Sequence, residues 1–222
     1  MGLSEGRIIM SSESKEYQYW SKKADSFDAA NTYIVGQNTF EAAQNWLKEQ
    51  LTIQDNVLEI GCGTGIFSAV IAESVRHLTA TDMSEEMLAK TRLRLQKYSN
   101  VEVKPADGYQ LAHAESTFDV AFMGNVLHIV KEPSTILKES YRTLRKGGRL
   151  LAMDYTLAGM TLPTKLAMII RYVSKLGMPP RDNKSYRSEE LAQLLQQAGF
   201  TIQDAQTIKR ESNVICLNAV KR

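Results

Sequence analysis

The chain has few cysteines and almost no net charge, and each shortage excludes a class of protein. Only two cysteines occur in 222 residues: Cys62 in a glycine-rich loop and Cys216 in a late strand pattern. This number excludes a disulfide framework and suits a reducing compartment. The formal net charge is only +2, with 27 basic and 25 acidic residues interspersed. A dedicated nucleic-acid-binding protein carries a much larger basic excess, so no nucleic-acid partner is expected.

Long apolar runs are also missing. Met1 to Lys15 contains no apolar core, so no secretory signal peptide is expected. The most apolar run, residues 166–170, is interrupted by Arg171 and is far too short to cross a bilayer. No His/Cys/Asp cluster has metal-ligand spacing. We therefore expect a cytoplasmic protein with no stable membrane insertion and no metal site.

Alternating strand and helix patterns occupy most of the chain. Strands are expected at residues 57–60, 77–81, 101–105, 118–123, 149–155, 201–208 and 213–220. Helices are expected near residues 66–74, 84–98 and 134–145, and from the N-cap Ser188 to Gly199. This alternation is typical of a parallel sheet covered by helices on both faces. The length is that of one domain spanning residues 1–222.

The most informative stretch is a strand that runs into a glycine-rich turn. Val57 to Ile60 is an apolar strand pattern, and Gly61, Gly63 and Gly65 follow within five residues. Glycines remove the Cβ atoms that keep a ligand away from the backbone. In open α/β sheets, nucleotide-like ligands bind in the crevice at the carboxyl ends of strands. We therefore expect the loop to face such a ligand.

The spacing of the glycines narrows the choice of ligand. A dinucleotide fingerprint requires Gly-x-Gly-x-x-Gly, but its third position is Ile66 here. No lysine follows Gly65, which excludes a Walker phosphate loop. Glu59, just before the glycines, would repel a pyrophosphate and favour a ligand that carries an ammonium group. An NAD(P)-dependent oxidoreductase stays open as the less favoured interpretation.

A carboxylate at the end of the second strand fits the same kind of ligand. Asp82 lies 21 residues beyond Gly61. This is close to the spacing of about 20 residues at which an acidic side chain accepts hydrogen bonds from ribose hydroxyls. The alternative is a helix cap, because Ser84-Glu85-Glu86 opens the next helical pattern.

Glu59-x-Gly61-x-Gly63-x-Gly65 closely resembles the first motif of the class I S-adenosylmethionine-dependent methyltransferases. The run that ends in Arg145-Lys146-Gly147-Gly148 resembles their small-molecule branch (ubiquinone/menaquinone methyltransferase-like), in which many relatives have Lys-Pro-Gly-Gly. The resemblance covers about residues 40 to 222. It implies a doubly wound, Rossmann-like α/β fold with seven mostly parallel strands, the last inserted antiparallel, and helices on both faces.

The resemblance also implies a cofactor, S-adenosyl-L-methionine, with S-adenosyl-L-homocysteine as the product. The glycine loop would hold the amino-acid end, Asp82 the ribose, and Asp107 with Gly108 the adenine. Cys62 is expected to be a small packing residue in the loop. The implied cofactor-binding residues are Glu59, Gly61, Cys62, Gly63, Gly65, Asp82, Met83, Asp107, Gly108 and Asn125.

Two segments lie outside this core pattern. The aromatic residues 13–38 resemble an N-terminal helical lid over the cofactor, with a helix on the sheet edge as an equal alternative. Residues 156–187 are expected to form a helical cap insertion. Its charged residues are Lys165, Arg171, Lys175, Arg181, Lys184 and Arg187, opposed by Asp182 alone. Such a cap suits an anionic or amphiphilic small-molecule acceptor or a membrane surface, although a solvated basic face explains it too.

Methyl transfer from a sulfonium requires mainly alignment, so the acceptor site is harder to recognise. His128, which follows the fourth strand, is the candidate general base, with a structural histidine as the alternative. Asp154 and Tyr155 are weaker candidates for contacting the acceptor, and His77 and His113 are expected to have no special role. O-, N-, C- and S-methylation all stay open, as do a monomer and a homodimer. A protein that binds the cofactor as a sensor or assembly factor, without transfer, is the main alternative function.

Overall fold

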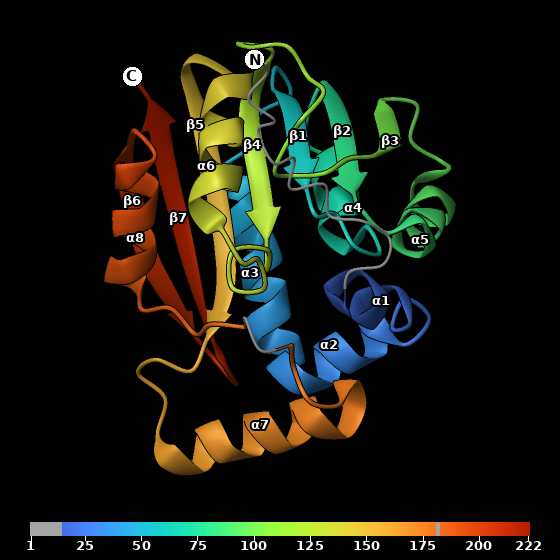
Figure 1. Ribbon diagram of the computed structural model, residues 1–222, viewed down its shortest axis with the longest axis vertical. Coiled ribbons are helices and arrows are strands. Elements are labelled where there is room, and N and C mark those ends of the chain that lie inside the picture. Colours follow the sequence, from blue (N-terminus) through green and yellow to red (C-terminus); the bar gives the residue numbers. More distant parts are fainter. Residues whose placement is uncertain (1–14, 181–182) are drawn as a thin grey trace, which may run out of the picture.

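The computed structural model describes residues 15–180 and 183–222, and its centre is an open seven-stranded sheet (Figure 1). The strand order is β3-β2-β1-β4-β5-β7-β6. Only β7 runs antiparallel to its neighbours, β5 and β6. The strands are β1 (Asn56–Ile60), β2 (His77–Asp82), β3 (Val101–Pro105), β4 (Phe118–Gly124), β5 (Leu144–Thr156), β6 (Phe200–Lys209) and β7 (Asn213–Lys221). The expected seven-stranded, mostly parallel sheet is confirmed.

Helices cover both faces of this sheet. One face carries α3 (Gln37–Glu49), α4 (Ile66–Ala72) and α5 (Glu85–Leu95), and the other carries α6 (Pro133–Thr143) and α8 (Ser188–Gln197). The central strand β4 shows why both layers are needed. Val120 and Phe122 belong to one hydrophobic cluster, and Ala121 and Met123 belong to the other. Because side chains alternate along a strand, a strand that is apolar throughout must be covered on both sides.

Local signals set most helix starts, with one correction. Ser84 caps α5, because its Oγ accepts a hydrogen bond from Met87 N at 3.2 Å. The expected N-cap Ser188 is wrong: it is the first residue of α8, and Arg187 occupies the cap position. The Arg187 N–H donates to Glu190 Oε2 at 2.8 Å. The Glu190 carboxylate, three residues after the cap position, therefore accepts the hydrogen bond of the Arg187 N–H.

The fifth strand starts earlier than the sequence pattern indicates. It begins at Leu144 and continues through Gly147 and Gly148, ahead of the expected start at residue 149. The pairing register shifts between Phe118 and Val120 on the neighbouring strand. A Cβ atom on Gly148 would lie 2.8 Å from the Arg145 carbonyl oxygen. The glycine pair thus allows a bulge in a continuous strand.

The start of α3 is fixed from the far end of the chain. Gly36, which precedes the helix, has a positive φ of 90° and no capping side chain. Glu211, in the turn between β6 and β7, accepts hydrogen bonds from Thr39 N at 3.0 Å and Thr39 Oγ1 at 3.2 Å. This carboxylate binds the orphan N–H groups of the helix and ties it to the sheet.

Three helices stand away from the sheet: α1 (Lys15–Ser21), α2 (Phe27–Val35) and α7 (Leu162–Leu176). The orange helix α7 packs on α2 and lies across the end of the molecule, below α2 and α3 in Figure 1. The Arg171 guanidinium donates to the Tyr33 carbonyl at 3.3 Å across this contact. In the described parts of the chain, every helix is too short or too polar to cross a membrane.

Two glycines offer a matched test of the Glu211 contact. Gly36 and Gly177 both have a positive φ and an extended ψ, so alanine pays a backbone strain of about 1–3 kcal/mol at either position. At Gly36 the new Cβ would also lie 2.5 Å from Glu211 Cβ, whereas nothing lies within 4 Å at Gly177. We expect Gly36→Ala to lower the free energy of unfolding more than Gly177→Ala does in chemical denaturation. Equal losses would contradict the proposed role of Glu211.

Candidate functional site

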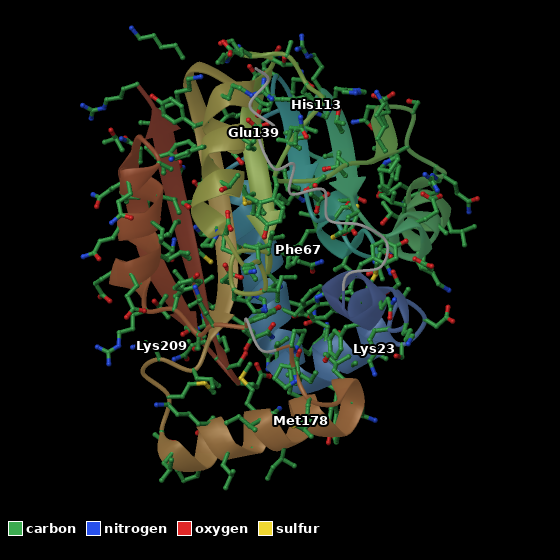
Figure 2. The ribbon with its side chains drawn as sticks, in the orientation of Figure 1. Lys23, Phe67, His113, Glu139, Met178 and Lys209 are labelled. Atoms are coloured by element: carbon green, nitrogen blue, oxygen red, sulfur yellow. The ribbon has the colours of Figure 1, made fainter. Side chains whose placement is uncertain are left out.

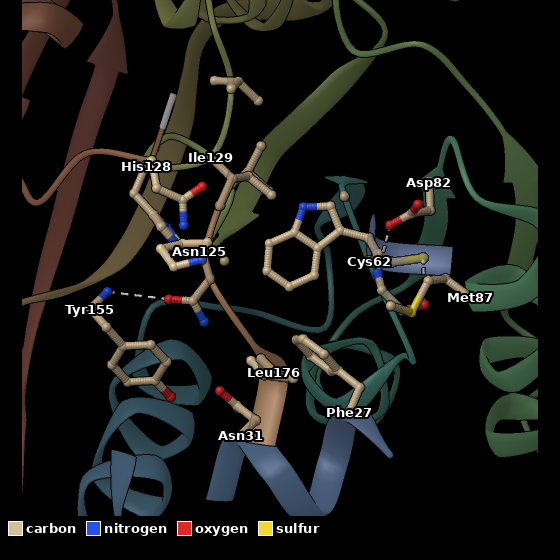
Figure 3. Close-up of a pocket in the computed structure, with 18 of the residues that line it drawn as sticks. Phe27, Asn31, Cys62, Asp82, Met87, Asn125, His128, Ile129, Tyr155 and Leu176 are labelled. Atoms are coloured by element: carbon tan, nitrogen blue, oxygen red, sulfur yellow. Dashed lines mark hydrogen bonds between the residues drawn. The ribbon is translucent and has the colours of Figure 1, made fainter. Parts of the chain in front are cut away.

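A pocket of about 420 Å³ opens at the carboxyl ends of β1, β2 and β4. Nine of the ten cofactor residues expected from the sequence line it, and so does His128. Figure 3 shows Asn125, His128 and Tyr155 on one side of the pocket and Cys62, Asp82 and Met87 on the other. The strand order reverses between β1 and β4, and such a switch point is where open α/β sheets bind ligands.

The glycine loop after β1 presents bare backbone to the pocket. Gly61 and Gly63 have φ angles of +74° and +55°. A Cβ atom on Gly61 would collide with Val126 Cγ2 at 2.5 Å, whereas nothing lies within 4 Å of a Cβ on Gly63. The space over Gly63 is therefore open to a ligand that approaches the main chain.

Gly65 is the one expected residue that does not line the pocket. It is the residue before α4 and has a φ of +80°. A Cβ atom there would lie 3.0 Å from Thr91 Cγ2 and 3.2 Å from Thr91 Cα, on helix α5. The third glycine thus permits close packing of the loop against α5.

Asp82 joins the glycine loop to the second strand. Its Oδ2 accepts a hydrogen bond from Gly63 N at 2.8 Å, and its Oδ1 accepts one from Ser84 N at 2.9 Å. Burial raises the pKa of Asp82, while these backbone hydrogen bonds oppose the shift. Each carboxylate oxygen can accept a further hydrogen bond, so the pair suits two adjacent hydroxyl groups. Ser84 supplies the side-chain cap of the next helix.

Glu59 lies beneath the loop, buried at the end of β1. The Ser68 hydroxyl donates to its Oε2 at 2.5 Å. Burial raises the pKa of Glu59 to about 8; the Ser68 hydrogen bond lowers it, and the negative charge of Asp82 raises it. With Asp107, the pocket lining contains three carboxyl groups. The carboxylates of Asp82 and Asp107 favour a cationic ligand and oppose a pyrophosphate, whereas Glu59 with its raised pKa serves as a buried hydrogen-bonding group.

The turn after β3 forms another wall of the pocket. Asp107 Oδ1 accepts a hydrogen bond from Tyr109 N at 2.9 Å, which closes a tight turn on the carboxylate side chain. A Cβ atom on Gly108 would lie 3.1 Å from Ile60 Cγ2. Ile136 lines the pocket nearby. The wall therefore combines an apolar surface with one carboxylate, a combination that suits a flat polar ring.

Asn125 holds the end of β4 in an unusual conformation. Its φ is +60°, a region that Asn tolerates better than most residues. Its N–H donates to the Met153 carbonyl at 2.7 Å, and its Oδ1 accepts from Tyr155 N at 3.2 Å. Both bonds lead to β5, so the loop that carries His128 is anchored to the sheet (Figure 3).

Cys62 has the environment of a packing residue. It is buried, and its sulfur lies 3.7 Å from Thr91 Oγ1. Burial and the nearby carboxylates raise the pKa of the thiol well above its usual value. A neutral buried thiol is a poor nucleophile, which agrees with the packing role expected from the sequence.

His128 forms a pair with a buried carboxylate. Its Nδ1 lies 2.6 Å from Asp154 Oδ1. Burial raises the pKa of Asp154, and the His128 charge lowers it. The expected contact of Asp154 with an acceptor is wrong, because Asp154 is buried behind His128 and does not line the pocket. With Nδ1 held in this way, Nε2 is the ring nitrogen that a ligand can reach.

The other residues named from the sequence fall into two groups. Tyr155 lines the pocket. Burial raises the pKa of its hydroxyl, whereas hydrogen bonding to Asn31 and Asn125 lowers that pKa. His77 and His113 lie outside the lining, as expected. His113 packs edge-on against Phe118, with 5.1 Å between the ring centroids.

Helices α1 and α2 cover the glycine-loop side of the pocket. Trp20 and Phe27 line it and contact each other edge-on, with 5.9 Å between their centroids. Asp28 accepts a 2.5 Å hydrogen bond from Thr64 Oγ1 in the glycine loop and pairs with Arg94 on α5. The described part of the N-terminal segment therefore lies over the pocket; residues 13 and 14 lie outside the described residues.

Helix α7 closes the opposite end and supplies residues that the sequence analysis missed. Met168, Tyr172 and Leu176 line the pocket from one side of this helix. Their spacing of four residues was a signal that they share a face. Arg181 and Asp182 of the expected cap lie outside the described residues. After this gap, Lys184 N donates to the His128 carbonyl at 2.8 Å, which ties the cap to the site.

Comparisons with known proteins agree with this geometry. Residues 58–152 match a family model described as a methyltransferase domain. A demethylmenaquinone methyltransferase from Listeria welshimeri is 30% identical over 152 residues, which cover 64% of this chain and 63% of the relative. The match thus spans less than two thirds of the length of that curated relative.

Solved structures share the fold at lower sequence identity. A methyltransferase from Thermotoga maritima, described as a possible histamine N-methyltransferase, aligns with a TM-score of 0.71 and 19% identity. The alignment covers 93% of this chain and 100% of the Thermotoga protein. The [4+2]-cyclase SpnF aligns with a TM-score of 0.63 and 19% identity over 82% of each chain. These comparisons show a match to a methyltransferase domain over residues 58–152 and a fold shared with these solved structures.

The buried Glu59 predicts a pH-dependent difference in stability. Its folded pKa of about 8 lies above the ordinary value, so its neutral form favours the fold at low pH. This contribution is lost as the pH rises from about 4.5 toward 8. Glu59→Gln stays neutral and can still accept from Ser68. We expect the melting temperature of the ligand-free variant, minus that of the wild type, to increase over this range. A constant difference in scanning calorimetry would contradict the burial of this charge.

Proposed function

We propose that this protein transfers the methyl group of S-adenosylmethionine to a small hydroxy-aromatic acceptor. The observation that carries the proposal is the acidic pocket at the glycine loop, in which Asp82 bonds to Gly63. This lining suits a cationic adenosyl ligand, whereas a pyrophosphate would face the carboxylates of Asp82 and Asp107. When bound, S-adenosylmethionine supplies a methyl group that is already activated by the positive charge on its sulfur.

The chain's own residues would bind the cofactor along the pocket. Asp82 would accept hydrogen bonds from the ribose hydroxyls, and Asp107 with Gly108 would contact the adenine. Glu59 and the backbone at Gly63 would hold the amino-acid end, with Gly61, Cys62, Met83 and Asn125 completing the lining. Holding both reactants in line can contribute about 7–11 kcal/mol to lowering the barrier. The segments 13–38 and 156–187 would exclude water, as lid and cap.

The acceptor would bind where His128, Tyr155 and Tyr172 meet. This end of the pocket is aromatic and apolar, with Met168 and Leu176 from α7. Its composition supports a flat ring with an apolar substituent. The name of the Listeria relative, a demethylmenaquinone methyltransferase, points to a hydroquinone of this kind. We take a short-chain demethylmenaquinol analogue as the first acceptor to test.

His128 would act as the general base for such an acceptor. Asp154 would accept a hydrogen bond from Nδ1–H and so fix the ring orientation, which leaves the Nε2 lone pair for the phenolic proton. Removal of that proton would raise the electron density of the acceptor, whose oxygen or ring carbon would form the new bond to the methyl group as the cofactor's sulfur leaves with the electron pair. For C-methylation, the displaced ring hydrogen would then leave as a proton. Asp154 is therefore a positioning residue.

A cofactor-binding protein without transfer activity is the second candidate. The similarity to the [4+2]-cyclase SpnF favours it, because the same fold carries another function there. Transfer of a labelled methyl group to any acceptor would exclude it. The buried free cysteines, Cys62 and Cys216, support the cytoplasm as the site of action.

The ribose-binding role of Asp82 predicts a large loss of affinity on substitution. Charge-assisted hydrogen bonds contribute about 1.5–3 kcal/mol each. We expect Asp82→Asn to weaken S-adenosylhomocysteine binding by about 10- to 100-fold in calorimetric titration. Asp204→Asn, at an exposed position on β6, is the matched control and should bind as the wild type does. An unchanged affinity in Asp82→Asn would remove this carboxylate from the cofactor site.

The base role of His128 predicts a loss of turnover without a loss of cofactor binding. General-base catalysis contributes about 100- to 10,000-fold. We expect His128→Gln to lower kcat by at least 100-fold with the demethylmenaquinol analogue, with a partial rise toward alkaline pH as the acceptor ionises. Asp154→Asn should lower kcat less and leave KM unchanged. A fall of less than about twofold in His128→Gln would leave the histidine with a structural role alone.

A further inference from the structure

One side of α7 exposes a continuous apolar surface. Leu162, Leu166 and Ile170 are 79%, 57% and 59% exposed, respectively. Val173 lies between them in the helical projection and Ile169 at their edge, because residues spaced three and four apart share a face. We call these five residues the outer face of α7. Met178, just beyond the helix, is 75% exposed and extends it (Figure 2).

The outer face is separate from the side of α7 that packs on the protein. Met168 and Leu176 are buried on the inner side, next to Tyr172. The helix is therefore apolar on two sides, and only the inner side has a partner among the described residues. Contiguous exposed apolar surface of this kind marks an interaction site.

The charge around the outer face has one sign. Residues 157–180 contain three basic residues and no acidic residue. Two of the basic side chains are held at the flank of α7 by helix α2: Arg171 donates to the Tyr33 carbonyl, and Lys175 Nζ lies 5.1 Å from the centre of the Tyr33 ring. These two fixed cations lie on the side of α7 that faces α2, and the segment that carries the outer face is basic.

We propose that the outer face of α7 docks on the surface of a lipid bilayer that carries anionic headgroups. An amphipathic helix lying in the interface buries its apolar side among the acyl chains and keeps its cations near the headgroups. The 15 residues of α7 span about 22 Å, enough for several such contacts in the membrane plane. A bilayer is the occupant that matches an apolar surface beside cations without a complementary groove.

The pocket opens next to this docking surface. Ile169 and Val173 belong to the outer face and also line the pocket. An amphiphilic acceptor could therefore keep its apolar tail in the bilayer while its ring entered the pocket. This last step rests on the proposed function, whereas the docking itself does not.

Vesicle co-sedimentation tests the docking directly. The probe is vesicles of phosphatidylcholine with or without equimolar phosphatidylglycerol, with S-adenosylhomocysteine present. We expect the wild type to bind the anionic vesicles at least tenfold more tightly than the neutral ones. The double variant Leu166→Glu/Ile170→Glu should lose this binding by at least tenfold. The matched control, Ile53→Glu/Leu93→Glu, changes two residues that are 66% and 64% exposed elsewhere, and it should bind as the wild type does.

A labelling experiment locates the contact. Both native cysteines are buried, so a thiol-reactive, polarity-sensitive dye attaches only at an added cysteine. The dye on Ile170→Cys should shift to shorter wavelengths with anionic vesicles, and the dye on Ile53→Cys should not. No vesicle binding, or equal binding by both double variants, would overturn the proposal. So would a concentration-dependent dimer that Leu166→Glu/Ile170→Glu abolishes, because the outer face would then bind a second copy. We expect all variants to bind S-adenosylhomocysteine as the wild type does. With that affinity intact, a loss of vesicle binding concerns the docking surface and not the proposed methyl transfer.

Discussion

The hydrogen bond between the Gly63 N–H and the Asp82 carboxylate is the contact on which the pocket depends. It joins the loop after β1 to the end of β2 at a distance of 2.8 Å. The positive φ of Gly63 turns the amide toward Asp82, and the missing Cβ leaves the space above it open. The other expected cofactor-binding residues come together because strands β1, β2 and β4 end at one edge of the sheet, at its switch point.

The fold and the cofactor half could be predicted because their signals are local. Strand and helix periods, the three glycines and the carboxylates at the ends of the first three strands lie within short stretches of sequence. The errors are local too: Ser188 lies one residue inside α8, and the pair Gly147–Gly148 forms a bulge in β5. Gly65 fits the motif, but its contact with Thr91 could not be predicted, because that contact depends on how α5 packs.

The acceptor half depends on contacts between distant residues, so less of it was visible in the sequence. Asp154 was named as an acceptor contact, but it is buried behind His128, 26 residues earlier in the chain. Asn31 on α2 and Tyr172 on α7 are far apart in the sequence, yet both line the pocket because α7 packs on α2. The same helix α7 presents one apolar side to this pocket and another to the outside, a division that composition alone does not reveal.

The most direct test of the account is the ligand preference of the wild-type pocket. Calorimetric titrations with S-adenosylmethionine, S-adenosylhomocysteine and NADH would compare a cationic adenosyl ligand, its neutral-sulfur product and a pyrophosphate-bearing dinucleotide. The acidic lining predicts micromolar binding of both adenosyl compounds and no measurable binding of NADH. Binding of NADH alone would contradict the account and return the glycine loop to the dinucleotide interpretation.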